Sequence, residues 1–159
     1  MKLNRLFIGA IVPLTLLNAI DIYPEVSGKI TYLKNVGDSV NKGEKIIQIN
    51  TKQIDATIKK EEAKLAYFKI ILDDKRLIES QNQELYESTV LPKRDLDIIK
   101  LERELAEAKY NEQKALVDFY KIEKQKYSIV SPIKGSVSDI PNPRNVTNIH
   151  QPQILMKIK

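Results

Sequence analysis

The chain has 159 residues, of which 42% are hydrophobic and 30% charged, and it contains no cysteine. This length suits one ordinary domain or two very small ones, and the composition is that of a folded protein rich in charged helix. The lack of cysteine excludes disulfides, thiolate metal sites, cysteine nucleophiles and a cysteine-linked lipid anchor. The net charge of +5 is interleaved with Glu and Asp and forms no basic stripe, so we expect no nucleic-acid binding.

Residues 1–20 form a short apolar segment behind a basic start. Lys2 and Arg5 come first, and the run LFIGAIVPLTLLNAI follows. As a helix this run would span about 22 Å, which is less than the ~30 Å hydrocarbon core, and Pro13 would kink it. The segment is therefore predicted to be a signal peptide cut near Ala19 or, as the alternative, an uncleaved N-terminal membrane anchor.

Residues 21–50 have the pattern of short β-strands joined by tight turns. Gly28, Gly37 and Gly43 interrupt runs rich in Val and Ile, and Asp38 follows the second glycine. Glycine adopts the positive φ that such turns require. Apolar side chains between the turns are expected to face inward, and these are Val26, Ile30, Val36, Val40, Ile46 and Ile49.

The same pattern of short β-strands and turns is found in residues 127–159. The stretch YSIVSPIKGSVSDI includes Pro132 and Gly135, and the chain ends in IHQPQILMKIK. Neither β-rich segment is long enough to bury a two-sided core, so we expect the two to pack together as one small sandwich. The predicted fold class is α+β, with a helical insert between the two halves of the β-domain.

Residues 51–126 contain one proline and no glycine, as expected for long helices. Apolar residues recur at heptad spacing, which predicts an antiparallel coiled-coil hairpin. In the first arm the predicted seam consists of Ile54, Ile58, Leu65, Phe68 and Leu72, with Glu61 and Lys75 interrupting it. In the second arm it consists of Ile98, Leu101, Leu105, Ala108, Ala115, Phe119 and Ile122, with Glu112 as the polar member.

The tip of the hairpin is predicted at residues 87–93. Proline is disfavoured inside a helix and accepted at its first turn, so Pro92 marks the start of the second arm. Asp95 and Asp97 then lie near the positive end of that helix. An arm of residues 93–126 would be a rod of about 50 Å.

This order of half β-domain, helical hairpin and second half-domain resembles the membrane fusion proteins, or periplasmic adaptors, of bacterial efflux pumps and haemolysin-type secretion systems. The stretch VGDSVNKGEKI at residues 36–46 is similar to the family's turn-and-strand signature. The stretch SPIKGSV at residues 131–137 is similar to the one that reopens the domain after the hairpin. The resemblance covers residues 22–158 and implies a split lipoyl-like or biotinyl-like β-sandwich.

The resemblance implies a periplasmic, non-enzymatic subunit without a cofactor that links an inner-membrane transporter to an outer-membrane exit duct. Copies would assemble side by side, and substrate would pass through the lumen unaltered. The family's β-barrel and membrane-proximal domains have no counterpart in these 159 residues, so we expect a minimal adaptor. Val146 and Pro152 stand where the family has later glycines, so the last turns are expected to differ.

At the tip, LYESTVLPKRDLD resembles the family stretch in which an Arg, a Leu and a Ser contact the exit duct. Leu85 occupies the Leu position, whereas Gln81 stands at the Arg position and Pro92 at the Ser position. Arg76 and Arg94 lie in nearby turns, and either would supply the missing charge. The alternative for Leu85 is a seam residue. The candidate docking residues are Gln81, Leu85, Pro92, Lys93 and Arg94.

Two other functions are considered. A carrier domain needs a modifiable lysine at the tip of a tight β-hairpin, and Lys52 in INTKQID is the nearest candidate. The alternative for Lys52 is a surface residue in the first helical turn, capped by Thr51. The other function is that of a stand-alone coiled-coil interaction protein. His150 is the sole histidine, so a histidine metal cage or triad has no second member.

Overall fold

The computed structural model describes residues 19–141 and 153–159. The signal-peptide or anchor prediction for residues 1–20 lies almost wholly outside these residues, and His150, Val146 and Pro152 lie outside them as well. Within the two described ranges, no helix is both long enough and apolar enough to cross a membrane.

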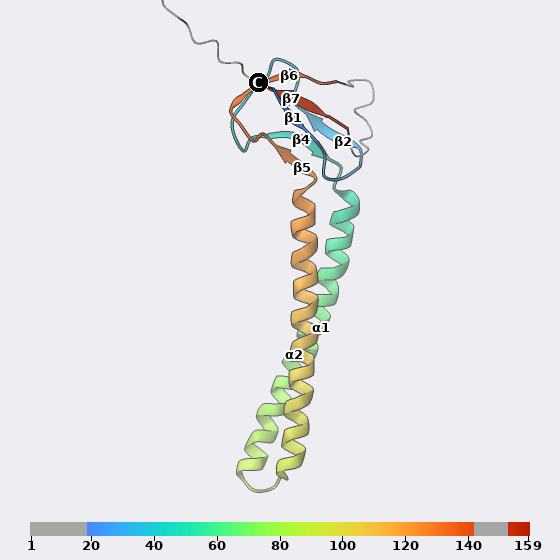
Figure 1. Cartoon of the computed structure of the whole chain (residues 1–159). Helices are drawn as coiled ribbons and strands as arrows, with labels where there is room; N and C mark the ends of the chain where they lie inside the picture. Colours follow the sequence, from blue (N-terminus) through green and yellow to red (C-terminus); the bar gives the residue numbers. More distant parts are fainter. Residues whose placement is uncertain (1–18, 142–152) are drawn as a thin grey trace, which may run out of the picture.

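A two-helix rod projects from a small β-domain (Figure 1). The rod consists of α1 (Lys52–Glu87) and α2 (Lys93–Gln125), which run antiparallel and contact each other along their length. The β-domain is formed by the chain on both sides of this insert, so the predicted α+β class is confirmed. Its strands are β1 (Ile20–Ile22), β2 (Ile30–Leu33), β3 (Ser39–Val40), β4 (Lys45–Ile49), β5 (Ser128–Val130), β6 (Gly135–Asp139) and β7 (Met156–Ile158).

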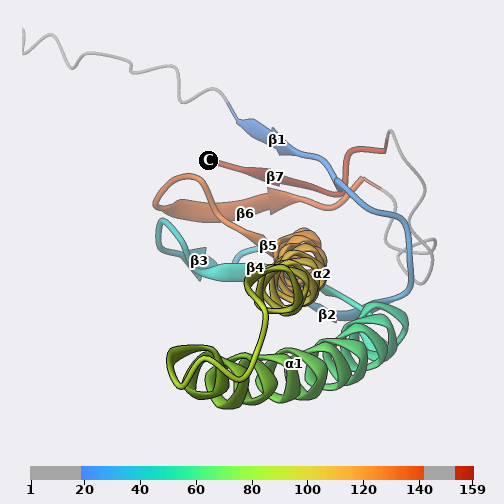
Figure 2. The same ribbon diagram turned by 90° about the horizontal axis from the view of Figure 1, so that it is seen from below.

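The strands form two antiparallel sheets, and each sheet joins the two halves of the chain. One sheet has the order β1-β7-β6-β3 and the other the order β2-β4-β5 (Figure 2). Residues that precede the hairpin, such as Ile47, and residues that follow it, such as Val137 and Met156, share one buried core. The prediction that the two segments pack together is therefore confirmed.

Two glycine turns connect the halves through backbone hydrogen bonds. Gly37 has φ 93° and Gly43 φ 80°, values that L side chains rarely adopt. The N–H of Gly37 donates to the Val137 carbonyl (2.9 Å), and that of Gly43 donates to the Ser131 carbonyl (2.7 Å). The Asp38 carboxylate accepts the N–H of Asn35 (2.8 Å) and closes the first turn.

Of the other predicted turn residues, Gly28 and Gly135 are closely packed against neighbouring atoms and Pro132 lies on the surface. A Cβ on Gly135 would lie 2.1 Å from the carbonyl oxygen of Lys159, and one on Gly28 would lie 2.7 Å from a methyl group of Ile49. Pro132 is exposed in the turn before β6. Of the side chains predicted to face inward, Val36 is 57% exposed, so that prediction is wrong: Val36 lies in the β2–β3 loop, outside the strand alternation.

Candidate docking surfaces of the hairpin

The inner face of α1 follows the heptad row predicted for it. Ile54, Ile58 and Leu72 are buried, and Leu65 and Phe68 are half-buried. The polar interruption predicted at Glu61 lies in the same row and is buried as well. The seam predicted for the first arm is therefore confirmed, including its polar member.

The inner face of α2 differs from the prediction. Its buried residues are Leu96, Ala106, Gln113 and Val117. Four of the seven predicted seam positions, among them Ile98 and Phe119, lie two residues from a buried position, and two residues turn a helix by about 200°. The predicted α2 seam is therefore wrong and lies on the outside. We call it the outer row; its large members are 47–58% exposed and its alanines are exposed too: Ile98, Leu101, Leu105, Ala108, Ala115, Phe119 and Ile122.

A buried polar pair accounts for this choice of face. The side-chain amide of Gln113 donates to a Glu61 carboxylate oxygen (3.0 Å) and to the Glu61 carbonyl (3.1 Å). The Lys64 ammonium lies 3.1 Å from the same carboxylate. The hydrogen bond from Gln113, followed by that from Lys64, lowers the pKa of Glu61 below its ordinary value. Because a buried carboxylate requires such partners, placing Gln113 inside satisfies Glu61 where an apolar seam would not.

Five ion pairs link the two helices. Arg103, for example, lies 2.8 Å from Glu79. Asp55 near the β-domain has its pKa lowered chiefly by the hydrogen bond from Lys124. These pairs fix the height of each helix against the other; they are Lys124–Asp55, Lys121–Glu62, Lys75–Glu102, Arg76–Glu107 and Arg103–Glu79, with 2.7–2.8 Å between charged atoms.

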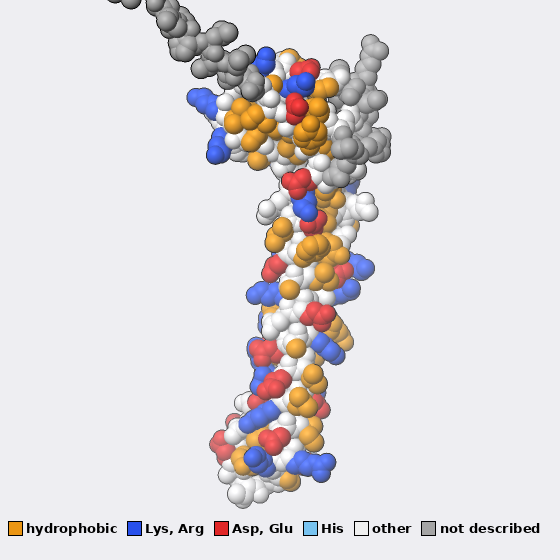
Figure 3. All heavy atoms as spheres, in the orientation of Figure 1, with side chains coloured by type: hydrophobic (Ala, Val, Ile, Leu, Met, Phe, Trp, Pro, Cys, Tyr) orange, Lys and Arg blue, Asp and Glu red, His pale blue; other side chains and the backbone are white. Residues whose placement is uncertain are grey.

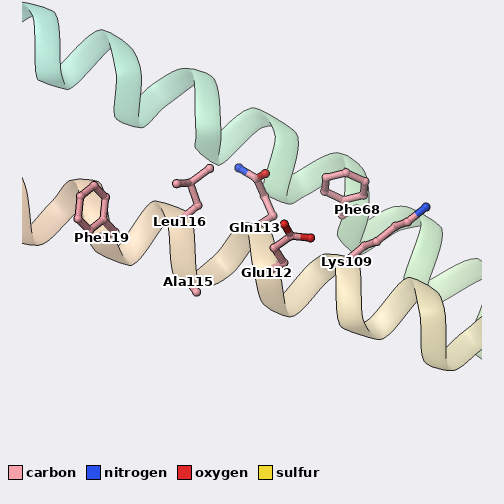
Figure 4. A pocket seen from close by; sticks show the side chains of 7 residues that line it. All are labelled: Phe68, Lys109, Glu112, Gln113, Ala115, Leu116 and Phe119. Atoms are coloured by element: carbon pink, nitrogen blue, oxygen red, sulfur yellow. The ribbon is translucent and has the colours of Figure 1, made fainter.

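A shallow apolar groove runs along one side of the rod, and hydrophobic side chains gather along the face of the hairpin seen in Figure 3. One part of this groove has a volume of about 590 Å³ (Figure 4). There Gln113 points towards α1, whereas Ala115 lies on the far side of α2. A second part of about 350 Å³ includes Tyr67 of α1 and Leu105 of the outer row. Of the polar side chains in the lining, Lys109 and Glu112 are exposed, and Lys75 is paired with Glu102, which suits contact with another protein surface better than chemistry on a small molecule.

The tip is a tight loop of residues 88–92 with an exposed apolar end. The Leu85 carbonyl accepts the N–H of Val90 (3.0 Å) and of Leu91 (3.2 Å), which closes the loop. Thr89 has φ 63°, a left-handed conformation that β-branched residues rarely adopt. Val90 is 71% exposed. The sequence patterns pointed to neither Val90 nor Thr89, and the apolar pair of Val90 and Leu91 in the loop was the available signal.

The five candidate docking residues all lie at this end of the rod. Gln81 and Leu85 are exposed on the last turns of α1, so Leu85 is not a seam residue. Pro92 precedes α2 with an extended backbone, and Lys93 and Arg94 are exposed at the start of that helix. The structure therefore brings the five to one end and leaves their side chains accessible.

Lys52 lies where β4 passes into α1, not at a β-turn. Its N–H donates to the side-chain oxygen of Asn50 (2.9 Å), and the Thr51 side chain makes no capping bond. The prediction that Thr51 caps this helix is wrong, because Asn50 reaches the free N–H instead. A lysine in the first turn of a helix lacks the tight hairpin that presents a carrier lysine.

No protein-family model and no curated protein matches the sequence. Solved structures do match, and the three described below each align with 89% of this chain. MacA from Actinobacillus actinomycetemcomitans matches over 49% of its own chain, with TM-score 0.73 and 22% identity. The membrane fusion protein Spr0693 from Streptococcus pneumoniae R6 matches over 60% of its chain, with TM-score 0.65 and 15% identity. The soluble domain of LipC, a membrane fusion protein of a type I secretion system, matches over 99%, with TM-score 0.59 and 11% identity.

These likenesses confirm, at the level of fold, the resemblance to membrane fusion proteins that the sequence indicated. The chain shares with them a helical hairpin inserted into a β-domain of antiparallel sheets. It spans about half the length of the MacA structure.

Proposed function

We propose that this chain is an adaptor subunit of the membrane fusion protein type, which links an inner-membrane transporter of an efflux or type I secretion system to outer components. The observation that supports this most is the shared architecture of a long hairpin inserted into a small β-domain, over 89% of the chain. Among solved relatives of this fold are a membrane fusion protein from Streptococcus pneumoniae and one of a type I secretion system.

The proposed mechanism is architectural. The β-domain would act as a lipoyl-like sandwich at the base, since its two sheets enclose one core drawn from both halves of the chain. The hairpin would act as the spacer, because the 36 residues of α1 extend about 54 Å. Substrate would pass along the assembled hairpins without being chemically altered, so the role needs neither enzymatic activity nor a cofactor.

The two ends of the rod would meet different partners. The β-domain end would face the inner membrane, with residues 1–20 serving as the export signal or as an anchor on the periplasmic side. The tip would meet an outer-membrane duct through the exposed side chains of Gln81, Leu85 and Arg94. Val90, the most exposed apolar residue of the tip loop, would add an apolar contact at the centre.

Site-specific photocrosslinking of the full chain in its native host tests this proposal. A probe replaces Tyr32 on the β-domain or Val90 at the tip, both of which are exposed, and Lys114, exposed in the middle of the hairpin, is the control position. We expect the probe at position 32 to capture a membrane-spanning transporter and the probe at position 90 a different outer component. Failure to capture a transporter at any position would favour the stand-alone coiled-coil protein. The intact mass of the same sample reports any lipoyl or biotinyl group on Lys52.

A further inference from the structure

The outer row of α2 is a second heptad row with no partner among the described residues of this chain. With the polar Glu112 counted between Ala108 and Ala115, its positions recur at alternating steps of three and four, the spacing of a coiled-coil seam. A two-helix hairpin needs one such seam per helix, and α2 already buries another against α1. A helix with two heptad rows is typical of a bundle in which it contacts two neighbours.

The outward face of α1 offers an apolar counterpart. Tyr67, Ile70 and Leu77 are 57–69% exposed, and Ala63 is exposed one turn before them. They follow one another along the helix at steps close to its period, so they form a stripe. We call these four residues the α1 stripe.

The interhelical ion pairs show which parts of the two surfaces lie at the same height. Leu77 lies in sequence between Arg76, which contacts Glu107, and Glu79, which contacts Arg103. Leu105 lies between those two α2 residues, so Leu77 and Leu105 are level. A second copy placed beside the first in the same orientation therefore brings apolar side chains of the α1 stripe onto the outer row.

Charges beside the two surfaces agree with that orientation. Near the β-domain, the Lys124–Asp55 and Lys121–Glu62 ion pairs place Lys59 and Asp118 two to six residues apart along the rod axis, or about 3–9 Å, a distance that two long charged side chains span. Neither Lys59 nor Asp118 forms an ion pair within the described residues, so the two are available to each other across an interface. Asp74 is level with Lys109, because Arg76 contacts Glu107 and each of the two residues lies two positions nearer the β-domain than its neighbour in that pair.

An antiparallel contact between two outer rows fits less well. If it were centred between Ala108 and Glu112, Glu102 of one copy would lie opposite Asp118 of the other. Like charges that face each other across an interface are unfavourable. The contact that the charges favour therefore joins two different surfaces.

We infer that the outer row of α2 packs against the α1 stripe of a second copy of this chain in the same orientation. The inference rests on the proposed function for the side-by-side arrangement of hairpins and adds the surfaces and the register. Because the two surfaces differ, the contact is heterologous and repeats from copy to copy, which builds a ring or an open array.

Cysteine crosslinking of the full chain in detergent tests the contact, since the protein has no cysteine of its own. Two differently tagged chains are mixed, one carrying Leu77→Cys and the other Leu105→Cys. We expect mild oxidation to give mainly the mixed dimer, at least about tenfold above either self-crosslinked dimer. Lys114→Cys, exposed on α2 outside the outer row, is the matched control and should give little product with Leu77→Cys. Equal self-crosslinking of Leu105→Cys would overturn the inference, as would the absence of any crosslink.

A charge swap tests the register independently. Asp118→Lys should weaken self-association about tenfold in sedimentation, since it sets two positive charges face to face. Lys59→Asp in the same chain should restore the association. Asp139→Lys on the β-domain, an exposed carboxylate far from both surfaces, is the control. If Asp118→Lys leaves association unchanged while thermal unfolding is also unchanged, the proposed register is wrong.

The two proposals fail in different ways. A chain that captures a transporter but gives no mixed dimer keeps the adaptor function and loses this interface. A chain that gives the mixed dimer but captures no transporter keeps the interface and loses the adaptor function.

Discussion

The β-domain and the hairpin use their apolar residues differently. In the β-domain Ile46, Ile47 and Ile49 are fully buried, so apolar character in the sequence corresponds to burial in the fold. In the hairpin the most regular apolar row of α2 is exposed, whereas Glu61 and Gln113 are buried. The β-domain is closed upon its own core, and the hairpin keeps much of its apolar surface on the outside.

The difference has a geometric cause. Two facing sheets enclose one interior. The alternation of side chains along each strand therefore decides which residues face that core and which face solvent. A helix in a two-helix rod buries only one stripe of its surface against its partner, although several of its stripes can be apolar. The buried polar groups that need hydrogen-bond partners then decide which stripe faces the partner helix. An apolar heptad row therefore indicates a contact surface without indicating which partner covers it.

The largest expected effect is a matched pair of truncations. Ile47→Ala opens a cavity in the β-domain and should destabilise the chain by about 2–5 kcal/mol. Leu105→Ala removes a similar volume from an exposed position and should change stability by no more than about 0.5 kcal/mol. Urea unfolding at a concentration where the chain is monomeric measures both. Equal losses would mean that the outer row is covered within one copy, and would remove the contrast between the two regions.

The next effect concerns the polar pair inside the hairpin. Gln113→Ala removes the donor that satisfies the buried Glu61 carboxylate, so it should destabilise the hairpin, by less than Ile47→Ala destabilises the β-domain. Hydrogen exchange of the helical amides measures the loss locally.

Replacing both partners is the control for that pair. Glu61→Leu together with Gln113→Leu removes the polar groups at once, and we expect it to recover the stability that the single variant loses. A double variant as unstable as Gln113→Ala would mean that the pair does not select the inner face.

Much of the fold follows from the sequence. Glycine turns and Val-rich runs placed two β-segments around a helical insert, and the polar interruption at Glu61 marked the true α1 seam. The α2 seam could not be derived from apolar spacing alone, because the two possible rows are both periodic. The partner of Glu61 decides between them, and that partner is 52 residues away in the chain.

The surface that a partner would contact was less predictable. Motif comparison drew attention to Gln81, Leu85 and Arg94, and these are exposed. The apolar end of the loop at Val90 was missed, because one valine carries no periodicity. The roles of all these residues in docking stay predictions.

A smaller and more gradual effect is expected from pH. Hydrogen bonds from Gln113 and from Lys124 lower the pKa of Glu61 and of Asp55 in the folded hairpin. A carboxylate whose pKa is lowered in the folded state stabilises the fold at pH values above its unfolded-state pKa. This stabilisation is lost as the pH falls through the folded-state pKa. The hairpin should therefore lose stability below about pH 4.5, the ordinary pKa of glutamate. Hydrogen exchange of helix and strand amides at falling pH measures this, with Glu61→Gln as the variant that should flatten the change.

The smallest expected effect has the opposite sign and contrasts the turns of the two regions. The β-domain has glycine at the positive φ angles of Gly37 and Gly43, whereas the hairpin tip has Thr89 at φ 63°. A β-branched residue in this conformation is strained, and glycine relieves the strain while adding entropy to the unfolded chain. We expect Thr89→Gly to stabilise the hairpin by a net 0.5–1 kcal/mol, about the difference of those two terms. Thr89→Asn should also stabilise, because Asn tolerates this region, and Thr89→Ala should gain less. Urea unfolding ranks the three, and a loss of stability in Thr89→Gly would show that the threonine side chain holds the tip loop in place.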